Sequence, residues 1–215
     1  MRKLLTYGSL ILSLLAAKPA FAQKGSSLTY YLYDTRNYHG VNFDGYNNDI
    51  PFGLNLSGFA DITSKIGESD LSKFYLEPRL VRTGFFKKGN DLVNRVLNSF
   101  RAIAEYNGAE KNSDDNLRFG LASNNKIKGM IVNFKYLPLN TKEGQQLAVF
   151  FKKDNGRLYI SGFFDYNIVK GRGKIVSEVQ VGINIADKLY GVIENRINQF
   201  IKEKHGVSVG IEYKF

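Results

Sequence analysis

Charged and aromatic side chains recur at every second position in several stretches of the sequence. Tyr75, Glu77 and Arg79 form one such set, and Phe59 and Asp61 form another. Side chains two residues apart lie on the same face of a β-strand, so a phenol, a carboxylate and a guanidinium would meet there. Such groups hold polar solutes by hydrogen bonds and ion pairs, and aromatic rings can stack on a flat solute. This spacing therefore favours binding over bond cleavage.

Residues for catalysis or metal binding are scarce. The chain has no cysteine, and its two histidines, His39 and His205, fall in a predicted loop and a predicted turn. No Gly-x-Ser-x-Gly elbow occurs, and no His, Asp and Glu grouping has the spacing of a metal site. Gly171-x-Gly173 is better explained by a hairpin turn than by a phosphate loop. We therefore expect no enzyme, cofactor or metal, and a lipid-modifying barrel hydrolase remains the less favoured alternative.

The last ten residues show the clearest structural pattern. Val207, Val209, Ile211, Tyr213 and Phe215 alternate with residues that are small, polar or charged. A strand of about 9–11 residues with one apolar face is what a membrane-spanning β-barrel requires. We expect this strand to close the barrel, and the terminal Phe215 to be read by the barrel-assembly machinery.

The first 22 residues have the features of a cleaved signal peptide. Arg2 and Lys3 precede an apolar core, and Ala20-Phe-Ala22 forms a small-x-small cleavage site. The remaining residues, 23–215, are expected to form a single barrel domain. Removing the leader lowers the formal net charge from +10 to +7, because Arg2, Lys3 and Lys18 lie in it and no acidic residue does. The other basic residues are scattered along alternating strands, so nucleic-acid binding is not expected.

Alternating segments separated by polar turns predict an all-β fold, a single antiparallel meander. The expected strands are residues 27–38, 53–63, 73–82, 100–106, 117–121, 130–138, 146–152, 158–168, 175–185, 190–200 and 206–215. Residues 39–49 are rich in Gly, Asn and Asp and predict a loop that could hold one short strand. Pro78 cannot donate to a ladder, so a bulge is expected there. Asp154-Asn-Gly156 predicts a tight hairpin of the type I′ kind.

Two segments conflict with an all-β assignment. Apolar residues recur at helical spacing in 91–106 and again in 189–204, which on pattern alone predicts two amphipathic helices. Hairpin pairing requires a strand before the terminal one, so strands are expected at 100–106 and 190–200. Residues 91–99 are then expected to form a helical turn within a loop.

Five short motifs resemble, in the same order along the chain, the Tsx-type nucleoside-specific channels of the bacterial outer membrane. They are Tyr33-Asp-Thr-Arg36, Leu56-Ser-Gly-Phe-Ala-Asp61, Phe74-Tyr-Leu-Glu-Pro-Arg-Leu80, Tyr159-Ile-Ser-Gly-Phe-Phe-Asp-Tyr166 and Val209-Gly-Ile-Glu-Tyr-Lys-Phe215. The resemblance implies a narrow monomeric barrel of twelve strands whose lumen passes nucleosides. This chain departs from the family in its shorter loops, its lack of Trp, and Asn37 in place of an aromatic residue. A barrel of ten strands is the structural alternative.

The expected site is therefore the lining of a lumen, in a protein that lies in the outer membrane in contact with lipid. Its residues are Tyr33, Arg36, Phe59, Asp61, Tyr75, Glu77, Arg79, Phe163 and Asp165. Other inward candidates are Tyr31, Arg101, Glu105, Arg118, Lys135, Tyr159, Glu178, Glu194 and Arg196. Glu77 and Arg79 are expected to form an interstrand ion-pair network, with contact to solute as the alternative. Charges of both signs suit a pore for small polar solutes.

Two further alternatives concern the interior. A barrel without an open pore could serve as an adhesin, a receptor or a structural element. A soluble lipocalin-like barrel would need apolar residues inside, the reverse of the alternation assigned here.

Overall fold

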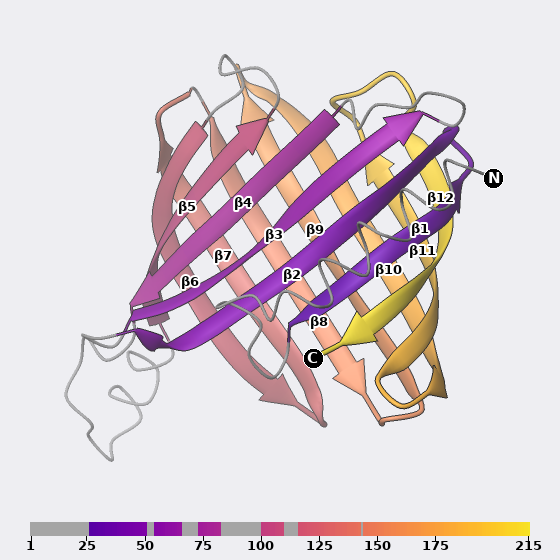
Figure 1. Cartoon of the computed structure of the whole chain (residues 1–215). Helices are drawn as coiled ribbons and strands as arrows, with labels where there is room; N and C mark the ends of the chain where they lie inside the picture. Colours follow the sequence, from indigo (N-terminus) through magenta and orange to yellow (C-terminus); the bar gives the residue numbers. More distant parts are fainter. Residues whose placement is uncertain (1–25, 51–53, 66–72, 83–99, 110–115, 143) are drawn as a thin grey trace.

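The chain forms a closed antiparallel β-barrel of twelve strands, which confirms the predicted fold class (Figure 1). The computed structural model describes residues 26–50, 54–65, 73–82, 100–109, 116–142 and 144–215. Every strand pairs with its neighbours in sequence, and β1 pairs with β12 to close the cylinder. Each strand therefore has a hydrogen-bonded neighbour on both sides.

The strands run through almost all the described residues. Their bounds are β1 Ser27–Asp34, β2 Tyr38–Ile50, β3 Leu54–Lys65, β4 Lys73–Arg82, β5 Phe100–Ala109, β6 Asn116–Ile127, β7 Met130–Asn140, β8 Gln145–Asp154, β9 Leu158–Val169, β10 Arg172–Ala186, β11 Leu189–Asn198 and β12 His205–Lys214. Among these described residues, no helix is long and apolar enough to cross a membrane.

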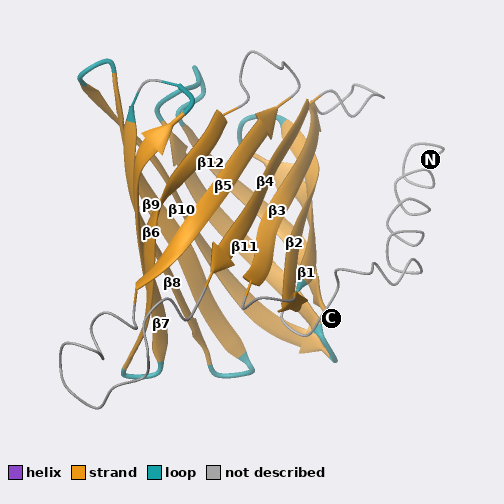
Figure 2. Ribbon diagram, turned by 90° about the vertical axis from the view of Figure 1, so that its left-hand side faces the viewer, coloured by secondary structure: helices purple, strands orange, loops and turns teal. Residues whose placement is uncertain are grey.

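Both ends of the barrel-forming chain lie at one end of the cylinder, here named the terminal end. Ser27 of β1 faces Lys214 of β12, and the Phe215 amide donates to the Ser26 carbonyl at 3.0 Å. The terminal end also carries the turns at 128–129, 155–157 and 187–188. The opposite end, here named the distal end, carries the connections at 35–37, 170–171 and 199–204 (Figure 2).

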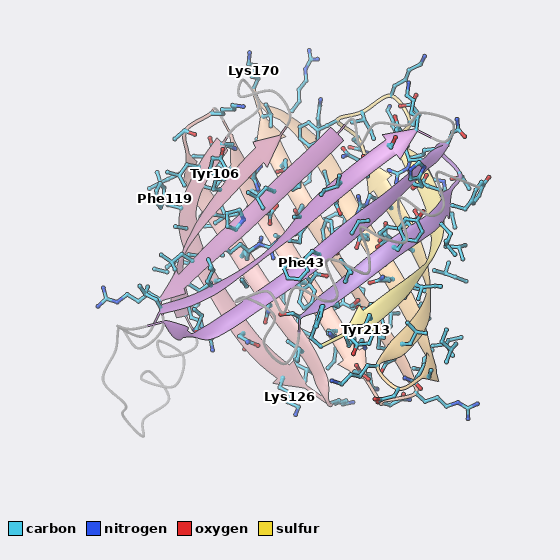
Figure 3. The ribbon with its side chains drawn as sticks, in the orientation of Figure 1. Phe43, Tyr106, Phe119, Lys126, Lys170 and Tyr213 are labelled. Carbon is cyan, nitrogen blue, oxygen red and sulfur yellow. The ribbon has the colours of Figure 1, made fainter. Side chains whose placement is uncertain are left out.

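Side chains alternate between the two faces of the wall, apart from the strand irregularities described below. Tyr106 of β5 and Phe119 of β6 project outward from the barrel (Figure 3). Many other exposed apolar side chains share this outer face, among them Leu121, Phe134, Leu147, Phe164, Ile183, Ile193 and Ile211. An apolar exterior around a polar interior is the arrangement of a barrel in lipid. It is the reverse of what a soluble lipocalin-like barrel would need.

The first predicted strand, 27–38, is divided in two by a turn at 35–37, where Asn37 has φ 65°. Residues 39–49, expected to be mainly loop, instead form most of β2. Residues 38–44 of β2 pair with β1 on one side and with β3 on the other, and the rest of β2 continues its pairing with β3, despite weak strand propensity. The prediction of a loop here was wrong because propensity yields to pairing on both edges.

A bulge lies in β1 rather than near Pro78. The register of β1 against β12 shifts between Tyr31 and Tyr33. The register of β3 against β4 is continuous through Pro78, so the bulge expected there is absent. A second irregularity lies between Phe119 and Leu121 of β6, opposite Pro138. A Cβ added at Gly120 would come within 2.9 Å of the Leu137 Cα, so only glycine allows this close approach.

The segment with helical spacing at 189–204 forms strand β11 and a following loop, so the strand expected at 190–200 is confirmed and the helix indicated by the spacing alone is not formed. Residues 100–106 likewise lie in β5, as expected. Residues 91–99 and the leader 1–22 lie outside the described residues. The hairpin at 154–156 is present, but only Gly156 in it has positive φ, whereas Lys128-Gly129 and Lys170-Gly171 have the paired positive φ of type I′ turns.

Candidate functional site

The barrel interior contains two hydrogen-bonded networks of polar side chains. We call the set on strands β4 to β9 the wall network; it comprises Tyr75, Glu77, Arg79, Glu105, Asn107, Arg118, Lys135, Gln146 and Asp165. We call the other set, on strands β10, β11, β1, β2 and β3, the cross-lumen network; it comprises Tyr31, Asn42, Asp61, Glu178, Glu194 and Arg196.

Glu105 of β5 is the centre of the wall network. Its carboxylate accepts from Lys135 Nζ at 2.7 Å, from Arg79 Nε at 3.1 Å and from Arg118 Nη1 at 3.2 Å. The Glu105 side chain is fully buried. Three cations from β4, β6 and β7 therefore compensate one desolvated carboxylate, which is the condition for a buried charge to be tolerated.

Glu77 of β4 is the second carboxylate of the wall network. Tyr75 Oη donates to it at 2.8 Å, Asn107 Nδ2 at 2.9 Å and Arg79 Nε at 2.7 Å. Arg79 thus bridges Glu77 and Glu105. The interstrand ion-pair network expected for Glu77 and Arg79 is present.

The wall network continues around the barrel to β9. Arg118 Nη1 donates to Gln146 Oε1 at 2.7 Å, and Gln146 Nε2 donates to Asp165 Oδ2 at 2.7 Å. Each link joins side chains on the same strand, on adjacent strands or on strands two apart. The network therefore follows the inner surface of the wall.

Arg196 of β11 is the centre of the cross-lumen network. Its guanidinium lies 2.5 Å from Glu178 Oε2 of β10, 3.3 Å from Glu194 Oε1 and 3.4 Å from Asp61 Oδ2 of β3. Strands β12, β1 and β2 lie between β11 and β3 in the wall. The Arg196–Asp61 pair consequently spans part of the lumen as a chord.

Two polar side chains complete the cross-lumen network. Tyr31 donates to Glu194, and Asn42 Nδ2 donates to Asp61 Oδ1 at 2.6 Å. Asn42 lies in the stretch of β2 that was expected to be loop. The network thus includes one side chain from each of the three strands β1, β2 and β3.

Phe59 of β3 lies between the two networks. Its ring centroid is 5.5 Å from that of Tyr75, and the Arg79 guanidinium carbon lies 5.6 Å from the same ring. These distances are those of an aromatic pair and a cation–π contact. Phe59, Tyr75 and Arg79 together present two ring faces and a planar cation to the interior.

The three cations that contact Glu105 are more exposed than the side chains of Glu77 and Glu105. The Arg79 side chain is 29% exposed, compared with 7% for Glu77 and 0% for Glu105. The guanidinium groups therefore lie between the carboxylates and the space of the lumen. A solute in the lumen would meet hydrogen-bond donors first.

Most of the expected lining residues do lie on the interior face. Phe59, Asp61, Tyr75, Glu77, Arg79 and Asp165 take part in the contacts above. Phe163 also faces inward, paired across the ladder with Phe150 of β8. These residues come from strands far apart in sequence.

Tyr33 and Arg36 lie elsewhere. The bulge in β1 places Tyr33 opposite the outward-facing Val209, and Tyr33 is 54% exposed on the outer surface. The placement of Tyr33 in the lumen was therefore wrong, because one extra residue reverses the alternation. Arg36 lies in the turn at the distal end, paired with Asp34, which also accepts from Ser208 Oγ at 2.7 Å.

Several interior residues were not among the expected lining set. Asn107, Gln146 and Phe150 fall on the inward face of strands β5 and β8, and period-two parity alone could have identified them. Asn42 could not be identified in this way, because the many Gly, Asn and Asp residues in 39–49 predict a loop.

Within the described residues, no group of three or more His, Asp or Glu side chains is arranged to hold a metal ion.

Comparison with solved structures supports the barrel architecture. The structure described as KdgM porin matches with a TM-score of 0.55 and 14% sequence identity, covering 88% of this chain and 99% of that chain. A triple mutant of Rhodopseudomonas blastica porin matches with a TM-score of 0.42 and 14% identity, covering 84% of this chain and 56% of that chain; no conclusion rests on this weaker similarity. No protein-family model matches the sequence, and no curated protein is significantly similar to it. At 14% identity, the first similarity establishes the barrel fold alone.

Proposed function

We propose that this protein is an outer-membrane channel for the passive diffusion of small polar solutes. The observation that carries the proposal is the inversion of the usual protein interior, with charged and aromatic side chains inside and an apolar surface outside. Polar and charged walls replace part of a solute's hydration as it passes. A barrel of twelve strands also exceeds the roughly eight strands that side chains alone can fill.

Nucleosides are the proposed solutes within this class. Phe59 and Tyr75 offer ring faces on which a base could stack, at a gain of about 1–3 kcal/mol per base in stacking sites of other proteins. Arg79 and Asp61 flank these rings and could bond to the sugar hydroxyls. The order of the motifs shared with nucleoside-specific channels supports the same solute.

Liposome swelling tests both levels of the proposal. Purified mature barrel is reconstituted, and swelling is measured with nucleosides, sugars and amino acids of matched size. Swelling with all three supports a general channel, and faster swelling with nucleosides supports the specific proposal. No swelling with any solute would contradict the channel itself.

Replacing Glu77 or Arg79 of the wall network sharpens the test. Glu77→Ala or Arg79→Ala is expected to change conductance and uptake without abolishing barrel assembly. Arg79 is partly exposed to the lumen, Glu77 holds it in place, and the network keeps its other members. Lys170→Ala, in an exposed distal turn, is the matched control and should leave conductance unchanged. Unchanged flux of every solute in both variants would refute the assignment of this lumen site.

A barrel without an open pore is the second candidate, favoured by one observation. The Arg196–Asp61 pair and the other side chains of the cross-lumen network occupy part of the lumen. Such a barrel would act as a structural or adhesin-type protein. Planar-bilayer recording distinguishes the two, since a closed barrel gives no discrete conductance steps.

The route to the membrane is part of the proposal. We infer that residues 1–22 are removed during export, that the remaining chain acts as a monomer, and that Phe215 is recognised by the assembly machinery. Deleting Phe215 should reduce the heat-modifiable, folded form in outer-membrane fractions. Replacement by Tyr, which keeps the aromatic ring, is the control; normal insertion of the deletion variant would contradict the terminal signal.

A further inference from the structure

A further side-chain cluster lies inside the barrel at the terminal end; none of its members belongs to either network, and Tyr31 of the cross-lumen network packs against the group formed by its tyrosines and Val192. It consists of Tyr159 of β9, Tyr190 of β11, Lys214 of β12 and Asp154 at the end of β8. The two tyrosine side chains are buried, and together with Val192 they form an interior apolar cluster. The proposed channel function uses none of these residues.

The Lys214 ammonium lies between the two tyrosine rings. Its Nζ is 3.8 Å from the centroid of Tyr159 and 3.8 Å from the centroid of Tyr190. The ring centroids are 5.5 Å apart and the ring planes meet at 63°. Asp154 Oδ2 lies 3.1 Å from the same nitrogen. One cation thus contacts two aromatic faces and one carboxylate, the combination that binds ammonium ligands.

The walls of this cage are held by groups other than Lys214. The Tyr159 ring lies directly over Gly182 of β10, where any Cβ would clash with it. Tyr190 Oη donates to the Gly156 carbonyl at 3.0 Å, and the Gly156 amide donates to Asp154 Oδ1 at 2.7 Å. The arrangement of the cage is therefore expected to survive removal of the lysine.

Other charged groups around the cage set its selectivity. Glu212 is buried two residues before Lys214 on the same inward face, and one of its oxygens has no hydrogen-bond partner among the described residues. Lys152 is a second cation near the cage, but its Nζ lies 5.9 Å from the Tyr159 centroid, farther away than the Lys214 Nζ. The side chains of Asp154 and Lys214 are 34% and 19% exposed, so the cage is accessible to solvent.

We propose that Tyr159, Tyr190 and Asp154 form a binding site for primary ammonium groups at the terminal mouth, and that Lys214 is its internal occupant. A solute that carries an alkylammonium group binds there by displacing Lys214. The closing strand β12 is thereby linked to the turn between β8 and β9, and a bound amine would release that link.

The test uses n-butylammonium, which reproduces the end of the lysine side chain. Lys214→Ala empties the cage, and binding is followed by the unfolding temperature of the detergent-purified barrel against ligand concentration. We expect the variant to bind n-butylammonium about tenfold or more tightly than the wild type, because two ring faces and a carboxylate become free. n-Butanol, equal in shape but uncharged, should give no shift.

Two further variants make the result specific. Adding Tyr190→Leu to Lys214→Ala should abolish most of the gain in n-butylammonium affinity. Lys152→Ala removes a neighbouring charge without emptying the cage, so this variant should bind like the wild type. If Lys214→Ala does not fold alone, refolding in n-butylammonium but not in n-butanol supports the site. Equal binding by variant and wild type, or refolding in neither additive, overturns it. Because the readout is unfolding and not flux, it is independent of whether the pore conducts.

Discussion

The wall network and the cross-lumen network are built with opposite centres. In the wall network, the buried carboxylate of Glu105 accepts from three cations. In the cross-lumen network, the guanidinium of Arg196 lies among three carboxylates, and it is partly exposed. The wall network is therefore centred on a carboxylate surrounded by cations, and the cross-lumen network is centred on a cation surrounded by carboxylates.

The two networks also differ in reach. The links of the wall network join strands no more than two apart, so it fastens neighbouring strands and leaves the lumen beside it. The Arg196–Asp61 pair passes over three intervening strands, so it limits the space available to a solute. We infer that the wall network mainly supports the barrel and that the cross-lumen network mainly restricts the pore.

The largest expected effect is on Glu105. Glu105→Gln keeps the shape of the side chain but leaves Arg79, Arg118 and Lys135 without their shared countercharge. Breaking a buried ion pair from one side costs about 3–5 kcal/mol, so the free energy of unfolding in lipid should fall by about that amount. Urea unfolding of the barrel in vesicles measures this change.

Glu203 provides the matched control for Glu105. It lies in the exposed 199–204 loop, and Glu203→Gln should change the unfolding free energy by less than about 0.5 kcal/mol. Equal stability of Glu105→Gln and Glu203→Gln would contradict the structural role assigned to the wall network.

A smaller loss of stability is expected from Arg196→Gln. Asp61, Glu178 and Glu194 would lose their shared cation, but water in the lumen hydrates them in part, so the cost should be about 1–3 kcal/mol. The pore should widen and become more cation-selective, because the chord is cut and the carboxylates remain. Single-channel conductance and reversal potential in a KCl gradient measure both changes; lower conductance would contradict the restricting role.

The smallest effect is expected from Asp61→Asn. Arg196 keeps Glu178 and Glu194, and the amide can still accept from Asn42, so stability should change by less than about 1 kcal/mol. Loss of one negative charge should shift the reversal potential toward anions, opposite in sign to Arg196→Gln. Shifts of the same sign in the two variants would show that their charges do not act on the same part of the lumen.

The sequence predicts most of this architecture because period-two alternation is local. Residues 158–168 and 175–185 show it without interruption, and the structure pairs them as β9 and β10. The alternation in the closing strand, residues 206–215, was equally clear. Which side chains pair within the networks could not be predicted from the sequence, because Asp61 and Arg196 meet only through closure of the barrel.

The failures have separate physical causes. In β2, hydrogen bonds from both neighbouring strands override the low strand propensity of Gly, Asn and Asp. At Tyr33, a single inserted residue reverses the parity and moves a ring from the interior to the outer surface. At β11 the prediction did not fail, because hairpin pairing placed a strand at 190–200 and the strand is present. The helical spacing there arises because Val192 faces inward while Ile193 and Ile197 face outward, which a periodicity count cannot separate from a helix.

The pairing of Ser27 with Lys214 has a practical consequence for experiments on intact cells. An even number of hairpin-linked strands returns the polypeptide to the side from which it set out, while the turn at 170–171 emerges on the other. An epitope grafted into that turn and one appended after Phe215 should therefore be reached by antibodies in opposite compartments. Orientation across the bilayer can thus be established by immunolabelling alone.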